Sequence, residues 1–320
     1  ALTQRWNGFA VRRSEFAPGE ALVDAGYLAP VVLAEFGALA AASVNALAPL
    51  GHPGLDRPQM WDMRVAHEQT TALAPSIADA ALRGRVLRAA AKADAALAPL
   101  AAGLPVQAIH GDLTDDNVMG TRGDDSRLHP HTVLDLGDLG LGWRVAELAV
   151  CASSMLHHEP ERPLRVIETI AAFPRDAPLS VAEARAVWPL VVLRAALLVA
   201  SGWRQLEIDG DNDYARERIA GEQAIFDAAT LLPLVEMTEH VLVAVGIDEG
   251  GFDATDRAAE AEVAPLASLL PDLTGRVAVI DPGVESAALD GGRWLREDAE
   301  EELIAEAIEL GVAVAVMPYG

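Results

Sequence analysis

Apolar residues recur every three or four positions through most of residues 21–245, and this spacing is typical of amphipathic helices. The first helix is predicted to begin after Ala29-Pro30 and to run to about residue 48, where Gly51-His52-Pro53-Gly54 interrupts the pattern. Aromatic residues make up only 5% of the chain and alanine is abundant, which favours helices over sheets. The further predicted helices span residues 61–74, 77–97, 144–157, 163–173, 181–206, 213–232 and 233–245.

Two apolar runs inside this region are too short for helices and predict β-strands. One is residues 106–109 and the other is residues 132–136, and the polar segment 120–130 between them is rich in Gly, Asp and Ser. The segment 106–136 is therefore predicted to be a hairpin-like unit. We expect an α+β fold, in which a mostly helical lobe of residues 21–245 surrounds this small β unit.

The two ends of the chain have a different character. Residues 1–20 are predicted to be a short extended piece, a hinge remnant that ends in the turn Ala17-Pro18-Gly19. Residues 246–320 are predicted to be a glycine-rich, acidic linker and a small α/β connecting segment, which can be incomplete. Its predicted strand, helix and strand span residues 276–280, 298–310 and 312–317. Because the chain lacks an initial Met and stops in what looks like a strand or turn, we expect a fragment of a longer chain with further domains.

Composition and charge narrow the classes of function. The formal charge is −24 and Lys92 is the single lysine, so the acidic surface repels phosphate backbones and nucleic acid is not an expected partner. The apolar run at 188–200 contains Arg194 and is too short to span a bilayer, which predicts a core helix and no membrane. Cys151 has no partner for a disulfide and the N-terminus lacks the order of a signal peptide, so a cytoplasmic location is expected.

The candidate chemistry lies in two motifs, IHGDLTDDNV at residues 109–118 and TVLDLGD at residues 132–138. Asp112 and Asn117 stand five positions apart, and Asp135 ends the second predicted strand. Phosphoryl transfer needs a group that orients the attacking hydroxyl and metal ions that neutralise the triphosphate, and Mg²⁺ prefers oxygen ligands. The pattern therefore indicates Asp112 as a base, with Asn117 and Asp135 as ligands of Mg²⁺.

Together, HGDxxxxN at residues 110–117 and DLGD at residues 135–138 resemble the motifs of the aminoglycoside phosphotransferase and choline kinase group of protein-kinase-like enzymes. The resemblance implies the C-terminal lobe of a protein-kinase-like fold. It implies ATP- and Mg²⁺-dependent transfer of a phosphoryl group to a hydroxyl of a small amine or amino acid. Glu147 stands where the family usually has Asp, and is expected to buttress the loop. Within the family, the stretch is similar to the hydroxylysine kinase-like branch, as found fused to class III aminotransferases.

The main departure from the family lies at the front of the chain. The family's N-terminal lobe supplies a phosphate-covering loop and a strand lysine, whereas Lys92 lies in a predicted helix just ahead of the catalytic loop. We therefore expect a fragment that lacks the ATP-covering lobe and binds ATP poorly. Two alternatives stay open. One is a degenerate kinase-like binding or spacer module without catalysis, and the other is a metal-dependent hydrolase that uses the same aspartates.

Several residues near the motifs have more than one interpretation. His110 either orients the loop through hydrogen bonds or transfers a proton. Asp138 either caps the next helix or supports the site from behind. Asp115 and Asp116 either attract an amine-bearing substrate or are solvated loop acids. The adjacent pair His157-His158 is expected to point in different directions and to lack a third ligand for a transition metal.

Overall fold

A computed structural model of the chain describes residues 2–6, 9–13, 16–208 and 213–247, together with the backbone of short strands beyond residue 276. The chain divides into two compact units, residues 1–248 and 249–320, and each is described by itself. The first unit is a mostly helical α+β lobe with small antiparallel sheets, so the predicted fold class is confirmed. Its helices are α1 (Pro30–Leu47), α2 (Ala66–Leu73), α3 (Ala80–Leu97), α4 (Arg144–Met155), α5 (Ile167–Ala172), α6 (Val181–Ile208), α7 (Asp213–Ala229) and α8 (Leu234–Ala244).

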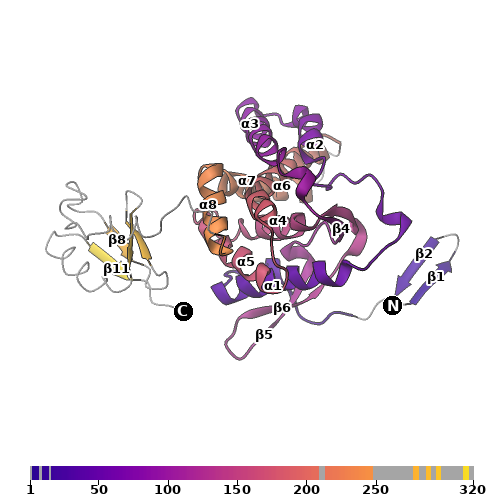
Figure 1. Cartoon of the computed structure of the whole chain (residues 1–320), viewed down its shortest axis with the longest axis horizontal. Helices are drawn as coiled ribbons and strands as arrows, with labels where there is room; N and C mark the ends of the chain where they lie inside the picture. The colour runs from indigo at the N-terminus through magenta and orange to yellow at the C-terminus, as the bar shows by residue number, and fades with distance from the viewer. Residues whose placement is uncertain are drawn as a thin grey trace. The chain divides into compact units, whose positions relative to one another are not determined.

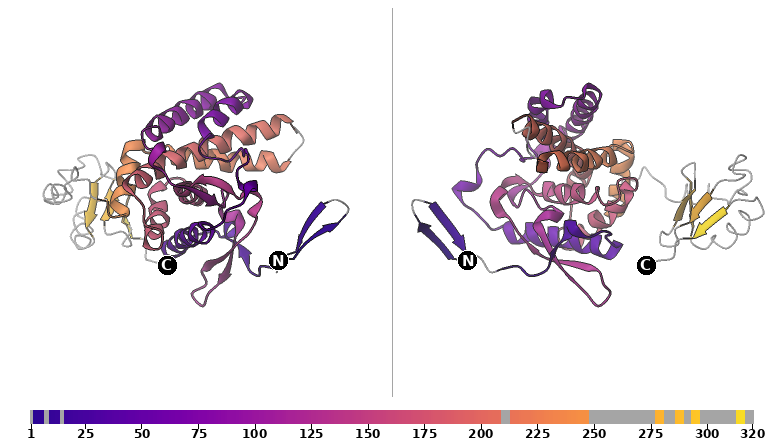
Figure 2. Two further views of the ribbon diagram at one scale, coloured as in Figure 1. Left: turned by 45° about the vertical axis from the view of Figure 1, so that its right-hand side comes forward. Right: turned by 180° about the vertical axis from the view of Figure 1, so that it is seen from behind.

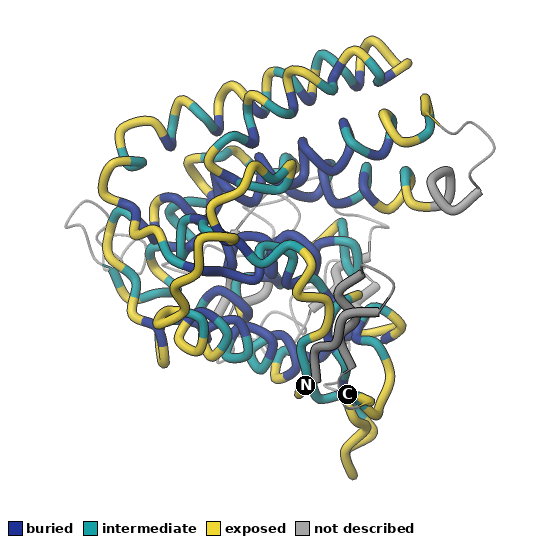
Figure 3. The backbone as a smooth tube through the Cα atoms, turned by 90° about the vertical axis from the view of Figure 1, so that its right-hand side faces the viewer, coloured by how far each residue is buried: buried dark blue, intermediate teal, exposed yellow. Residues whose placement is uncertain are grey.

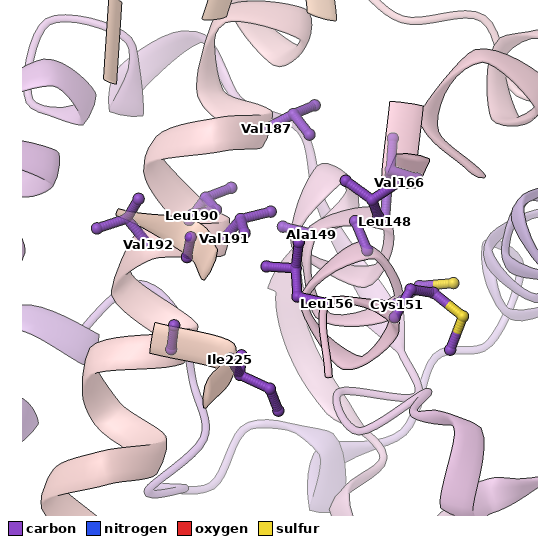
Figure 4. Packing of buried hydrophobic residues seen from close by; sticks show 14 of the residues in the cluster. Leu148, Ala149, Cys151, Leu156, Val166, Val187, Leu190, Val191, Val192 and Ile225 are labelled. Atoms are coloured by element: carbon purple, nitrogen blue, oxygen red, sulfur yellow. The ribbon is translucent and has the colours of Figure 1, made fainter. Parts of the chain in front are cut away.

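The long helix α6 is the centre of the lobe. It packs against α2, α3, α4, α7 and α8, and Figures 1 and 2 show these helices grouped around it. Trp188 of α6 is fully buried, and its indole N–H donates a hydrogen bond to the carbonyl oxygen of Ala229 at 3.3 Å. Ala149 of α4 lies near Val191 of α6 in this core (Figure 4). Most residues of α4 and α6 are therefore buried in the core of the lobe.

Among the residues that the structure describes, two helices, α1 and α6, are long and apolar enough to cross a membrane by length and composition alone. The helix predicted at 181–206 is confirmed as α6, which has 28 residues, and the apolar run 188–200 lies inside it. Burial is the better criterion, since 83% of the apolar window of α6 lies inside the lobe. The dark blue of buried residues runs along this helix in Figure 3, which is typical of the core helix of a globular lobe.

Two small sheets carry the candidate motifs. In one, β3 (Glu20–Ala21), β5 (Val118–Arg122) and β6 (Leu128–Val133) pair in the order β3-β5-β6. In the other, β4 (Val106–Ile109) pairs antiparallel with β7 (Gly140–Trp143). The true hairpin is therefore β5–β6, and the prediction that strand 106–109 forms a hairpin-like unit with strand 132–136 was wrong.

The sequence pattern misplaced these strands for two physical reasons. The partner of β4 has the sequence Gly-Leu-Gly-Trp, and two glycines remove the alternation of side chains by which a strand is predicted. The segment 120–130 contains strand residues because Gly120 allows close approach: a Cβ there would lie 2.9 Å from the carbonyl oxygen of His129. The polar composition of this segment therefore does not mean that all of it forms a turn, because both of its ends belong to strands.

The predicted helices are mostly confirmed, with differences at their ends. The helix predicted at 61–74 begins only at Ala66, because Asp62 and Arg64 bond to each other in a turn at 62–65. The start of α3 is fixed by Asp79, whose side chain accepts hydrogen bonds from the backbone N–H groups of Ala81 and Leu82.

The remaining described strands lie near the two ends of the chain. β1 (Leu2–Trp6) and β2 (Phe9–Arg13) form an antiparallel pair, within the segment predicted to be extended. In the second unit, β8 (Val277–Ile280) pairs parallel with β11 (Ala313–Val316), and β9 (Ser286–Leu289) pairs antiparallel with β10 (Arg293–Arg296). Strands were predicted at 276–280 and 312–317, and the predicted helix at 298–310 lies outside the described residues.

Candidate active site

The first motif forms a loop between β4 and β5, and the buried side chain of His110 holds this loop through hydrogen bonds. Its Nε2 lies 2.7 Å from the carbonyl oxygen of Leu134, and its Nδ1 lies 3.3 Å from the backbone nitrogen of Asp112. Because the backbone N–H of Asp112 donates, Nδ1 must accept, so the proton is on Nε2 and is donated to Leu134. Both ring nitrogens are thus engaged in holding the loop, which favours the orienting interpretation of His110 over proton transfer.

Glu147, in the first turn of α4, holds the same end of the loop through hydrogen bonds to its backbone. Its side chain is fully buried, and Oε2 accepts hydrogen bonds from the backbone N–H groups of His110 at 2.5 Å and Gly111 at 3.4 Å. Burial raises the pKa of this carboxyl, while His110 and the two backbone bonds act against the rise. Glu147 therefore contacts the loop backbone and lies behind it.

Asp112 and Asn117 are in direct contact. The Asn117 side-chain amide donates hydrogen bonds to the Asp112 carbonyl oxygen at 2.9 Å and to its Oδ2 at 3.1 Å. The other carboxylate oxygen of Asp112 accepts a 2.5 Å ion pair from Arg194 of α6. Since Nδ2 of Asn117 is turned toward Asp112, the Oδ1 atom of its amide is left for a cation.

Asp135 lies two residues after the end of β6. The backbone N–H of Leu134 bonds to the carbonyl oxygen of Asn117 at 2.8 Å, so the two motifs are joined next to their functional residues. Asp135 has a left-handed backbone with φ of 51°, and one of its carboxylate oxygens accepts a bond from the backbone N–H of Gly137 at 3.0 Å. Asp135 is exposed to solvent.

Asp138 completes an acidic group with Asp112 and Asp135. Burial raises the pKa of Asp138, and the negative charges of Asp112 and Asp135 raise it further, so Asp138 lies within electrostatic reach of both. Asp138 does not cap α4, because the residue at that cap is Trp143. A set of carboxylate and amide oxygens fits a hard divalent cation such as Mg²⁺.

Comparison with known proteins bears on this geometry. The family model of the phosphotransferase enzyme family, APH, matches residues 3–183 of the chain. The chain belongs to this family. The APH match includes all the candidate site residues from His110 to Glu147. No match was found among curated proteins.

Several solved structures are similar to the chain. An aminoglycoside phosphotransferase from Alicyclobacillus acidocaldarius is 14% identical, with 74% of each chain covered and a TM-score of 0.51. A choline/ethanolamine kinase family protein from Mesorhizobium loti is 19% identical, with 68% of each chain covered and a TM-score of 0.47. A microcompartment-associated aminopropanol kinase is 17% identical, with 69% of this chain covered and a TM-score of 0.47. The chain spans 65% of the length of the aminopropanol kinase.

Arg194 lies outside the range of the APH match, and it is a site residue that the sequence interpretation missed. Its guanidinium is buried, stacks over the ring of Trp61 at 4.3 Å and pairs with Asp112. Two of its N–H groups, at Nε and Nη1, are buried without a hydrogen-bond partner. A single charged residue in the apolar run 188–200 was the available signal, because such a residue is rarely buried unless it is paired.

The structure also corrects the expectation for the adjacent histidines. Nε2 of His157 and Nε2 of His158 lie 2.7 and 2.9 Å from the same carboxylate oxygen of Asp115. Asp115 is therefore neither a solvated acid nor open to a substrate amine, since only 1% of its surface is exposed. Burial acts to raise its pKa, but the bonds from the two histidines outweigh this and lower the pKa to about 2.

Proposed function

We propose that this chain is an ATP-dependent phosphotransferase that moves the γ-phosphoryl group to a hydroxyl of a small amine or amino acid. Membership of the APH family supports the reaction class. The observation that carries the proposal is the contact between Asp112 and Asn117, in a loop that His110 and Glu147 hold at one end. Asp138, which lies within electrostatic reach of both Asp112 and Asp135, supports it.

Each residue has a role in the proposed reaction. Asp112 accepts the proton of the attacking hydroxyl, and Asn117 and Arg194 orient its carboxylate. Asn117 and Asp135 would hold Mg²⁺, which supplies positive charge against the triphosphate of ATP when it is bound. His110, Asp138 and Glu147 keep the loop and the acidic group in place.

The charge around the loop supports an acceptor that carries an amine. Burial and the negative charges of Asp115 and Asp112 raise the pKa of Asp116, which places another acid close to Asp112. A cleft lined by carboxylates concentrates cations. The hydroxylysine kinase-like branch and a cytoplasmic location belong to the same proposal. Since the chain spans 65% of the aminopropanol kinase, the activity is proposed for the whole protein.

Acceptor-dependent formation of ADP from ATP tests the proposal directly. The assay uses the whole protein with Mg²⁺ and a panel of amino alcohols and hydroxy amino acids, and detects the phosphorylated product by mass spectrometry. Asp112→Asn should lower kcat by a factor of about 10² to 10⁴, which is the usual contribution of a general base. Asp125→Asn changes an exposed acid in the β5–β6 turn and is the matched control. Equal turnover in Asp112→Asn and the wild type would refute the role of Asp112.

A binding module without catalysis is the second candidate. The observation in its favour is the ion pair between Arg194 and Asp112. Both carboxylate oxygens of Asp112 already have partners, Arg194 and the Asn117 amide, and are less available to accept a proton from a substrate. Calorimetric titration with ATP and Mg²⁺ separates the two candidates. Heat that disappears in Asp135→Ala supports the phosphotransferase, whereas no heat from nucleotide or metal supports the module.

A further inference from the structure

A second group of possible ligands involves the catalytic loop at Asp115. It consists of Oδ2 of Asp115 and the Nε2 atoms of His157 and His158, and these three atoms all lie within 4.8 Å of one another. Among the residues whose side chains the structure describes, this is the one cluster of three or more His, Cys, Asp or Glu ligand atoms at such spacing. The APH match does not explain why two histidines meet one buried aspartate.

The burial of the three residues leaves one open side. Asp115 is 1% exposed and the side chain of His158 is 7% exposed, whereas 27% of the His157 side chain is exposed. Both histidines follow directly after α4, in a turn of the chain. The cluster therefore has a buried floor, formed by Asp115 and His158, and one ligand that solvent can reach.

The donor set is one that transition metals bind. Imidazole nitrogen suits zinc and its neighbours in the first row, and a carboxylate oxygen completes many such sites. The two Nε2 atoms are turned to the same oxygen, so their lone pairs can be directed to one point once each Nε2 has lost its proton to Nδ1. Ligand atoms about 2.0–2.2 Å from an ion in a tetrahedron lie about 3.3 Å apart, which needs only a small opening from the observed 2.7 and 2.9 Å.

We infer that Asp115, His157 and His158 form a site for a divalent transition-metal ion of the zinc class, with the fourth position open to water beside His157. This site differs from the proposed Mg²⁺ site in its ligands, because it offers two nitrogens and one oxygen instead of oxygens alone. The ion would join the end of α4 to the loop at a position two residues before Asn117. The ion would fix the loop in place. This inference does not depend on whether the chain transfers phosphate.

Titration of the metal-free full chain with Co²⁺ tests the site. Co²⁺ is a spectroscopic substitute for zinc, and its visible absorption reports nitrogen ligands and low coordination number. We expect saturation at about one equivalent, reversal by Zn²⁺ and at least about tenfold weaker binding in His157→Gln and in His158→Gln. His157→Gln is the safer variant because its side chain is partly exposed, and a thermal melt without metal shows that each variant is folded.

Two controls make the result specific. His129 also contacts carboxylates, Glu35 at 2.7 Å and Asp125 at 3.0 Å, but through its two different ring nitrogens, so His129→Gln should leave the titration unchanged. Asp124→Asn, a change at an exposed acid between β5 and β6, should also leave it unchanged. The inference is overturned if Co²⁺ shows no saturable absorption, or if folded His157→Gln and His158→Gln bind Co²⁺ as the wild type does. Loss of binding in His129→Gln would equally overturn it.

Discussion

Replacing Glu222 with glutamine should remove a pH dependence from the stability of the lobe. Glu222 of α7 has 8% of its surface exposed, and its Oε2 is buried against Gly202 of α6 without a hydrogen-bond partner. Burial raises the pKa of this carboxyl to about 7, although the charges of Arg218 and Arg194 act to lower it. The folded chain therefore holds a proton on Glu222 at a pH where the unfolded chain has lost it.

The sign and the size of the effect follow from this difference. The stabilising contribution of the protonated group is fully present below the unfolded pKa, which is near 4.5, and is lost as the pH rises through about 7. A difference of about 2.5 pKa units at about 1.4 kcal/mol per unit gives about 3 kcal/mol, as an order of magnitude. Glutamine resembles the protonated acid, so Glu222→Gln should equal the wild type near pH 4.5 and be the more stable protein near pH 8.

Urea unfolding followed by tryptophan fluorescence, from about pH 5 to about pH 8, measures the free energy of unfolding of both proteins. The difference between Glu222→Gln and the wild type should grow from about pH 5 to about pH 7 and then level off. Glu161→Gln, a change at an exposed glutamate, should run parallel to the wild type. If the Glu222→Gln curve is also parallel to the wild type, the burial argument for this carboxyl is refuted.

Three further changes test the packing behind the site. Glu147→Ala should lower the free energy of unfolding by about 2–4 kcal/mol in urea, because the buried N–H groups of His110 and Gly111 lose their acceptor, and a loss under about 0.5 kcal/mol would contradict this. Trp188→Ala should cost about 3–5 kcal/mol by the same measurement, and Trp188→Phe distinctly less; equal losses would argue against a cavity effect. Asp79→Ala should cost about 1 kcal/mol in thermal unfolding, while Asp79→Asn, which can still cap the helix, should stay close to the wild type. An Asp79→Ala variant as stable as the wild type would show that the cap is unimportant.

Local sequence signals predicted much of the fold, and contacts between distant residues account for most of what they missed. Helical spacing located α1 and α6, and the short motif located the loop with Asp112 and Asn117 in contact. The pairing of β4 with β7 escaped prediction because the glycines of the second strand carry no side-chain pattern. The partner of His157 and His158 lies more than 40 residues earlier in the chain, at Asp115, and spacing within a local motif carries no information about such contacts.

The helix α4 contacts the catalytic loop near both of its ends. Glu147, in its first turn, bonds to residues 110 and 111, and the histidines just past its last turn bond to Asp115. The loop and α4 should therefore open and close as one cooperative element. Amide hydrogens from 110 to 117 should exchange with solvent no faster than those of α4, so the region with the chemistry is among the most rigid parts of the lobe, and substrates have to be admitted by movements elsewhere.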